Sequence, residues 1–232
     1  MPWTTKRRHE CYSVWPTDLM PMRSRARLLI TILIAVLSVL SAIHAPRVQA
    51  SETRQFDTAW IPVADGNAQP TAAWSEFCER SPGECAINPA EPATIKLDES
   101  VWNAIVAINK HVNAAVAPQE DIAHWGVIDR WDYPDDGYGD CEDYQILKRR
   151  LLVEAGLPRR ALRMVVVLDE LGAGHAVMAV RTDQGDFILD NKRDAVLPWH
   201  QTGYVYIKSE GDRTHAWIWL RNQATVTSAI SR

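Results

Sequence analysis

The stretch GDCEDYQILKRRLLVEAG, residues 139–156, combines a cysteine with the apolar spacing of an amphipathic helix. Apolar side chains recur three to four positions apart between Ile146 and Leu152, and Gly156 is a suitable C-terminal stop. We therefore expect a helix that begins at residue 141 or 142 and ends at residue 155. Cys141 would lie near the positive end of its dipole and near unpaired backbone N–H groups. That environment favours the thiolate, the nucleophilic form of cysteine.

The segments on either side of this helix predict the fold class. An earlier helix is expected from Asp98 to Ala117, capped by Asp98 or Ser100, and an aromatic-rich, ordered loop over 119–139. Strand-like runs separated by short polar turns follow the second helix; they are Arg163–Leu168, His175–Arg181, Asp186–Asp190, Tyr204–Lys208 and His215–Leu220. Helices followed by antiparallel strands predict an α+β domain in which the cysteine-bearing helix packs on the sheet.

Two downstream residues are suited to activate Cys141. His175 begins one predicted strand and Asp190 ends the next. The imidazole would act as general base toward the thiol, and the carboxylate would orient the imidazole and hold its tautomer. The alternatives are a structural histidine on a buried strand and an aspartate that forms a turn. The combination predicts a cysteine hydrolase or acyl transferase with a Cys-His-Asp triad.

An oxyanion that develops during such a reaction needs hydrogen-bond donors. Backbone N–H groups at the start of the second helix are suited to this role. The indole N–H groups of Trp125 and Trp131 are further candidates. The alternative for both tryptophans is packing in the core, the commoner role of this residue.

Three carboxylates surround the cysteine in sequence, namely Asp140, Glu142 and Asp143. Uncompensated, they would oppose formation of the thiolate. Bound Ca²⁺ would offset their charge with the oxygen ligands that it prefers, and nearby acids would contribute; these are Asp132, Asp135 and Asp136. The alternative is capping, because acidic groups stabilise the first turn of a helix. The chain has no CxxC or HExxH pattern, which argues against zinc.

The N-terminal residues carry the pattern of an export signal. Arginines at 23, 25 and 27 precede an apolar run from Leu28 to Ile43, and Val48-Gln49-Ala50 precedes Ser51. This pattern predicts a signal peptide cleaved after Ala50 and a periplasmic protein, with an uncleaved inner-membrane anchor as the alternative. We divide the chain into an N-terminal extension with signal peptide over 1–50, an extended arm over 51–75 and one catalytic domain over 76–232.

Charge and cysteine usage agree with an exported domain. The first 50 residues hold 7 Lys and Arg and 2 Asp and Glu. Residues 51–232 therefore hold 18 Lys and Arg and 27 Asp and Glu, a formal charge of −9. Such an acidic surface argues against nucleic acid or anionic membrane as the main partner. Cys78 and Cys85 are spaced to form a disulfide loop in an oxidising compartment, so that Cys141 is the remaining thiol of the exported part.

These motifs resemble the bacterial transglutaminase-like cysteine peptidases, which include the LapG-type periplasmic proteases. The matching stretches are His124-Trp125-Gly126, Trp131-Asp132-Tyr133-Pro134, Gly139-Asp140-Cys141-Glu142-Asp143-Tyr144, Lys148, Gly156, Gly174-His175-Ala176-Val177 and Leu189-Asp190-Asn191. The resemblance implies the papain-like core of the transglutaminase superfamily, a Cys141-His175-Asp190 triad and calcium at Asp140 and Glu142. It also implies two partners: a cell-surface adhesin as protein substrate and an inner-membrane receptor.

Three functions follow as hypotheses. The first is an exported cysteine endopeptidase that hydrolyses a protein substrate through an acyl-enzyme. The second is other amide chemistry with the same triad, either transglutamination or hydrolysis of peptidoglycan peptides. The third is a calcium-responsive binding domain whose catalytic residues are vestigial.

Overall fold

The computed structural model describes residues 58–213 and 216–221. The predicted signal peptide, its cleavage site after Ala50, Cys11 and His215 lie outside the described residues. Within them, no helix has the length and hydropathy needed to cross a bilayer.

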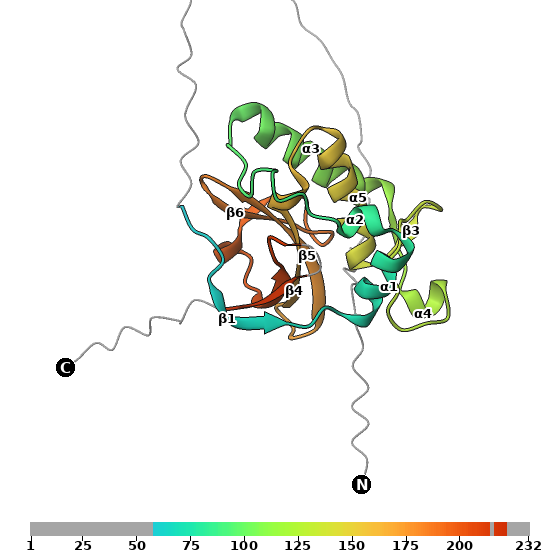
Figure 1. Cartoon of the computed structure of the whole chain (residues 1–232). Helices are drawn as coiled ribbons and strands as arrows, with labels where there is room; N and C mark the ends of the chain where they lie inside the picture. The colour runs from blue at the N-terminus through green and yellow to red at the C-terminus, as the bar shows by residue number, and fades with distance from the viewer. Residues whose placement is uncertain (1–57, 214–215, 222–232) are drawn as a thin grey trace, which may run out of the picture. The chain divides into compact units, whose positions relative to one another are not determined.

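A seven-stranded antiparallel sheet forms the centre of the domain (Figure 1). Its spatial order is β1-β9-β8-β4-β5-β6-β7. The strands are β1 (Val63–Ala68), β4 (Leu162–Leu168), β5 (Gly174–Thr182), β6 (Gly185–Leu189), β7 (Leu197–Pro198), β8 (Val205–Glu210) and β9 (Trp217–Leu220). A separate parallel pair joins β2 (Ala117–Pro118) to β3 (Tyr138–Gly139).

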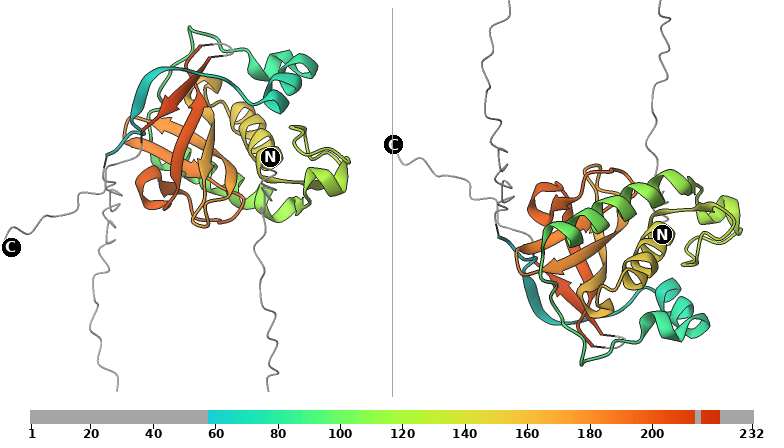
Figure 2. Two further views of the ribbon diagram at one scale, coloured as in Figure 1. Left: turned by 90° about the horizontal axis from the view of Figure 1, so that it is seen from below. Right: turned by 90° about the horizontal axis from the view of Figure 1, so that it is seen from above.

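The helices precede most of the sheet in sequence and lie to one side of it (Figures 1 and 2). They are α1 (Ala72–Arg80), α2 (Pro82–Cys85), α3 (Glu99–Ala115), α4 (Asp121–His124) and α5 (Cys141–Glu154), with short 3₁₀ turns η1 (Arg159–Ala161) and η2 (Trp199–Gln201). Side chains of α3 and α5 pack on β5 and β6 in one core cluster that includes Ile105, Leu152, Met178 and Phe187. The predicted α+β class is therefore confirmed.

The strands have hydrophobic residues on both faces because both faces are covered. On β4, Leu162 and Met164 pack in the clusters that contain the helices, whereas Val165 and Val167 pack on the opposite side. That second side is covered by Ile61 and by the segment around η2. Successive side chains of β4 point to opposite faces of the sheet, and both faces are apolar. This explains why β4 is apolar along most of its length.

The main predicted elements lie where the sequence patterns indicated. The helix expected over 98–117 is α3, and Asp98 caps it by accepting a hydrogen bond from the Val101 N–H at 2.9 Å. The helix expected from residue 141 or 142 is α5, and Gly156 follows it with a φ of 91°. The structure adds α1, α2 and an edge strand, β1, which lies within the stretch predicted as an arm. The predicted disulfide between Cys78 and Cys85 links α1 to α2.

Glu210 on β8 connects the helices to the sheet from a fully buried position. Its carboxylate accepts from Arg149 of α5 at 2.9 Å and from Arg159 of η1 at 3.0 Å. It also accepts from the Trp74 indole of α1 and from the Met164 N–H of β4, both at 3.0 Å. Burial alone would raise the pKa of Glu210, but the two guanidinium charges lower it to about 2.

We predict that Glu210→Gln lowers the free energy of unfolding at neutral pH by about 3–5 kcal/mol, because two buried guanidinium groups lose their counter-charge. The pKa of Glu210 falls from 4.5 to about 2 on folding. Its ionised form therefore contributes fully to the free energy of unfolding above pH 4.5, and this contribution is lost as the pH falls toward about 2. Denaturant unfolding between neutral and acid pH measures both effects.

Asp212→Asn is the matched control. Asp212 pairs with Arg160 at 3.5 Å with half of its side chain exposed, so its loss should cost less than about 1 kcal/mol. Equal destabilisation by the two substitutions would contradict a central role for Glu210.

Candidate active site

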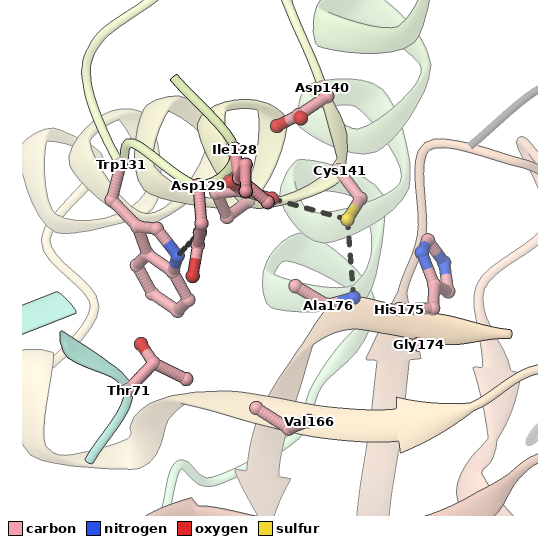
Figure 3. Close-up of a pocket in the computed structure, with 11 residues that line it drawn as sticks. Thr71, Ile128, Asp129, Trp131, Asp140, Cys141, Val166, Gly174, His175 and Ala176 are labelled. Carbon is pink, nitrogen blue, oxygen red and sulfur yellow. Dashed lines mark hydrogen bonds between the residues drawn. The ribbon is translucent and has the colours of Figure 1, made fainter. Parts of the chain in front are cut away.

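A pocket on the helix side of β4 and β5 contains Cys141 and His175 (Figure 3). The thiol comes from the first residue of α5 and the imidazole from the second residue of β5. Further lining residues are Thr71, Ile128, Asp129, Trp131, Asp140, Glu142, Val166, Gly174 and Ala176. Figure 3 shows Cys141 between His175 on one side and Ile128, Asp129 and Trp131 on the other.

Local backbone geometry places Cys141 at the helix start. Asp140 is the N-cap residue of α5, and its N–H donates to Asp143 Oδ2 at 3.4 Å. Asp143 Oδ1 accepts the Asp132 N–H at 2.8 Å, which attaches the preceding loop. A side chain at Gly139 would meet the Asp143 Cβ at 2.8 Å, so glycine is required for this close approach. Capping, one alternative for Asp143, is therefore part of its role.

His175 and Asp190 form a buried pair. His175 Nε2 lies 2.9 Å from Asp190 Oδ1, and both side chains are almost fully buried. Burial would raise the pKa of Asp190, but hydrogen bonds from His175, Tyr204 and the Lys192 N–H, with the charge of His175, hold it well below its usual range. The carboxylate is therefore ionised at neutral pH. Because it engages Nε2, proton exchange with the thiol falls to Nδ1.

Tyr204 is a second support for Asp190 that the sequence patterns did not identify. Its hydroxyl donates to Asp190 Oδ2 at 2.6 Å, and its ring stands edge-on to His175 with centroids 5.7 Å apart. Tyr204 precedes β8, so its contact with the end of β6 depends on sheet topology. No local motif signals such a partner.

Lys192 joins the loops that carry His175 and Asp190. Its ammonium donates to Asp169 Oδ2 at 2.5 Å, and its N–H donates to Asp190 Oδ1 at 3.0 Å. Asp169 in turn accepts from Leu171 N and Ala173 N, in the turn that leads to β5. The ion pair therefore fixes the approach of the two strand ends to each other.

The sulfur of Cys141 has two neighbours of opposite effect. The Ala176 N–H donates to Sγ at 3.4 Å, which stabilises negative charge on sulfur. Glu142 Oε2 lies 3.2 Å from the same atom and accepts from the thiol. An ionised carboxylate at that distance opposes loss of the thiol proton. The Ala176 N–H therefore favours the thiolate, and the Glu142 carboxylate opposes it when ionised.

The two tryptophans lie differently from each other. Trp131 lines the pocket, but its indole N–H donates to Asp129 Oδ1 at 3.1 Å. Trp125 does not line the pocket; its ring centroid lies 4.0 Å from that of His124, and the Arg130 guanidinium lies 4.6 Å from it. The geometry gives neither indole the oxyanion role that the sequence suggested. Backbone N–H groups in the first turn of α5 are the better donors.

Five acidic residues gather above the pocket in two overlapping groups. Asp121, Asp140 and Asp143 form one, and Asp121, Asp129 and Glu142 form the other, with ligand atoms of each group within 4.8 Å of one another. Asp121 and Asp129 come from the 119–139 segment and were not expected at the site. They lie 12 or more residues before Cys141, so only the folded loop brings them there.

The buried members of these groups fit a divalent cation. Burial raises the pKa of Asp121, and it raises that of Asp143 to about 9. Burial and the neighbouring Asp140 and Asp143 raise the pKa of Glu142 well above its usual range. Within the described residues, Asp121 Oδ1 is buried without a hydrogen-bond donor. Crowded carboxylate oxygens of this kind are ligands suited to Ca²⁺.

The three other acids considered from the sequence have different partners. Asp132 pairs with Arg130 at 2.8 Å, Asp135 lies 3.6 Å from Arg150, and Asp136 lies 2.7 Å from His124 Nε2. None belongs to either carboxylate group of the described residues. They contribute to the loop rather than to the candidate cation site.

Comparison with known proteins agrees with this chemistry. The family model described as bacterial transglutaminase-like cysteine proteinase BTLCP matches residues 64–225. No curated protein matches the chain. Among solved structures, Legionella pneumophila LapG is 25% identical, with 52% of this chain and 68% of that chain covered and a TM-score of 0.44. The calcium-bound form of Legionella pneumophila LapG is 25% identical, with 54% of this chain and 74% of that chain covered and a TM-score of 0.44.

The family match includes every residue of the site, from Thr71 to Tyr204. A nucleophilic cysteine at a helix start with a histidine on a neighbouring strand is what such a peptidase requires. The chain belongs to the bacterial transglutaminase-like cysteine proteinases and is a cysteine peptidase.

Proposed function

We propose that this protein is an exported endopeptidase in which Cys141, His175 and Asp190 act as a triad on a protein substrate. The observation that carries the proposal is the shared pocket of Cys141 and His175, with Asp190 2.9 Å behind the imidazole. Transglutamination and hydrolysis of peptidoglycan peptides would use the same residues, and the activity assay below separates them. Membership of a peptidase family argues against a vestigial binding domain.

The proposed reaction begins with transfer of the thiol proton to His175 Nδ1. The thiolate, which accepts the Ala176 N–H, attacks the scissile carbonyl, and first-turn N–H groups of α5 stabilise the charge that develops on the carbonyl oxygen. His175 then protonates the leaving amine, which leaves an acyl group on Cys141. Water activated by His175 releases the acyl group. Asp190 and Tyr204 hold the imidazole in one orientation throughout.

We further propose that the acidic cluster binds Ca²⁺. Asp121, Asp129, Asp140, Glu142 and Asp143 would hold it, and its charge would offset the carboxylates beside the thiol. The 3.2 Å contact of Glu142 with Sγ makes this compensation relevant to reactivity.

Export and partners complete the proposal. The signal-like sequence of residues 23–50 and the Cys78–Cys85 disulfide support a periplasmic location. A cell-surface adhesin as substrate and an inner-membrane receptor follow from the sequence motifs shared with LapG-type proteases. Both partners are tested by comparing surface and periplasmic proteins of cells with and without the gene.

The first prediction concerns the nucleophile. Cys141→Ala should abolish cleavage of a substrate found in that comparison, whereas wild-type Cys141 should react with iodoacetamide at neutral pH as a thiolate. Mass spectrometry of the products, with a labelled amine and with muropeptides in parallel reactions, distinguishes hydrolysis of protein from the other amide chemistries. Undiminished cleavage by Cys141→Ala would refute the proposed function.

The second prediction concerns Tyr204. Tyr204→Phe should lower kcat/KM by about ten- to a hundredfold, because a hydrogen bond to a charged group is worth roughly 1.5–3 kcal/mol. Tyr206→Phe is the matched control, since the Tyr206 hydroxyl donates to the Trp199 carbonyl at 3.0 Å instead. Steady-state kinetics of both variants measure the difference. A comparable loss in Tyr206→Phe would show that the effect is structural.

The third prediction concerns calcium. Chelation should lower both Tm and cleavage rate, and Ca²⁺ should restore both, because a ligand at about 100 times its Kd stabilises the folded state by about 2.7 kcal/mol. Asp121→Asn should weaken the Ca²⁺-dependent rise in Tm. Asp135→Asn, which alters an exposed acid outside the cluster, should leave it intact. A Tm that does not respond to Ca²⁺ in the wild-type chain would exclude the site.

A further inference from the structure

Several large apolar side chains are exposed on the segment that runs from α4 to β3. Ile122, Trp125, Val127, Ile128 and Tyr138 are between 41% and 77% exposed, and we call them the apolar loop surface. They account for five of the eleven exposed large hydrophobic residues of the described chain. Single exposed apolar residues are ordinary, but a concentration of them marks an interaction site.

The members of the apolar loop surface adjoin one another in the fold. The His124 ring stacks on Trp125 with centroids 4.0 Å apart and meets Tyr138 edge-on at 6.3 Å. Val127 and Ile128 continue the chain from Trp125. In Figure 1, α4 and β3 lie at the end of the domain away from β1 and β6. Two members therefore meet through one histidine ring, and the others lie on the same short loop.

Hydrogen bonds hold this surface in a defined shape. The Trp125 N–H donates to the Asp121 carbonyl at 2.7 Å, and the Gly126 N–H donates to the same oxygen at 3.2 Å. The Arg130 N–H donates to the Asp121 carboxylate and closes the loop. A surface fixed before binding loses less conformational entropy when a partner docks.

The apolar loop surface is continuous with the catalytic pocket. Ile128, its most exposed member, lines the pocket beside Asp129 and Trp131 (Figure 3). The occupant of a surface next to the nucleophile of a peptidase is the polypeptide that it cuts. We propose that the apolar loop surface binds an extended substrate segment rich in large apolar side chains, on one side of the scissile bond. This inference rests on the proposed function and names its substrate class.

The chemistry of the segment follows from the surface. Its five side chains are aliphatic or aromatic and offer only one ring hydroxyl and one indole N–H, so they gain free energy mainly by burying apolar groups. A disordered receptor tail or a folded receptor face would also meet this description chemically. Alkylation of Cys141 distinguishes them, because we expect a bound substrate segment to shield the thiol and a bound receptor to leave it accessible.

The test uses an array of short synthetic peptides, each paired with a copy in which Leu, Ile, Val and Phe are replaced by Ser. The Cys141→Ala chain is the probe, so that captured peptides are not cut. It should retain the apolar copies in preference to the Ser copies. Trp125→Ser or Ile128→Ser in the same chain should reduce this capture about tenfold, the effect of losing roughly 1.4 kcal/mol of apolar burial.

Val153→Ser is the matched control, since Val153 is an exposed apolar residue at the opposite end of α5. It should leave capture unchanged. In the wild-type chain, a captured peptide should also slow alkylation of Cys141 by iodoacetamide. Trp125→Ser should remove this protection. The measure is the ratio of the alkylation rates of Cys141 with and without peptide, determined separately for each chain.

The inference would be overturned by equal capture of apolar and Ser copies, or by capture and protection that survive both substitutions. Capture of apolar peptides without protection of Cys141 would also overturn it, because it would assign the surface to another partner. Trp125 is 41% exposed and Ile128 is 77% exposed, and Tm values equal to that of the wild-type chain confirm folding of each variant. Since the array measures binding alone, failure of the wild-type chain to cleave any captured peptide or any protein of the surface comparison would refute the proposed function, whereas loss of the apolar preference would refute only this inference.

Discussion

The buried carboxylate of Glu210 is the constraint on which the arrangement of this domain depends. It joins Arg149 of α5, Arg159 of η1, Trp74 of α1 and Met164 of β4 at a single point. Helix α5 carries the thiol, and β4 is the neighbour of the strand that carries the imidazole. An ion pair in a dry interior is directional and costly to break, so it fixes the position of α5 more sharply than apolar packing alone.

A second set of contacts fixes the other half of the site. Asp190 receives hydrogen bonds from His175, Tyr204 and the Lys192 backbone, while the Lys192 ammonium reaches back to Asp169. The histidine and its carboxylate therefore come from adjacent strands whose ends are tied together. The cation site proposed on the opposite side of Cys141 uses carboxylates that helix capping alone does not explain. The nucleophile, the helix cap and the proposed cation ligands share one short segment, and the last two roles both call for acidic residues.

Sequence patterns predicted the elements that have strong local signals. The spacing in α3 and α5, the capping by Asp98 and the stop at Gly156 all depend on neighbours within a few residues, as does the short Cys78–Cys85 loop. The edge strand β1 has no such signal, because its sequence VADGNA contains few residues typical of strands. It pairs with β9 from the far end of the chain, and that pairing forms only in the folded domain.

The sequence by itself determined the chemistry: a lone thiol at a helix start, a histidine and an aspartate on later strands, and acids around the thiol. Only the tertiary structure decided which other groups contact these residues. In the fold, Asp121 and Asp129 join the acidic cluster. The Trp131 indole donates to Asp129, and the Tyr204 hydroxyl donates to Asp190. Residue type and local spacing report what a side chain is able to do. Its partners depend on distances across the sheet, which no short stretch of sequence contains.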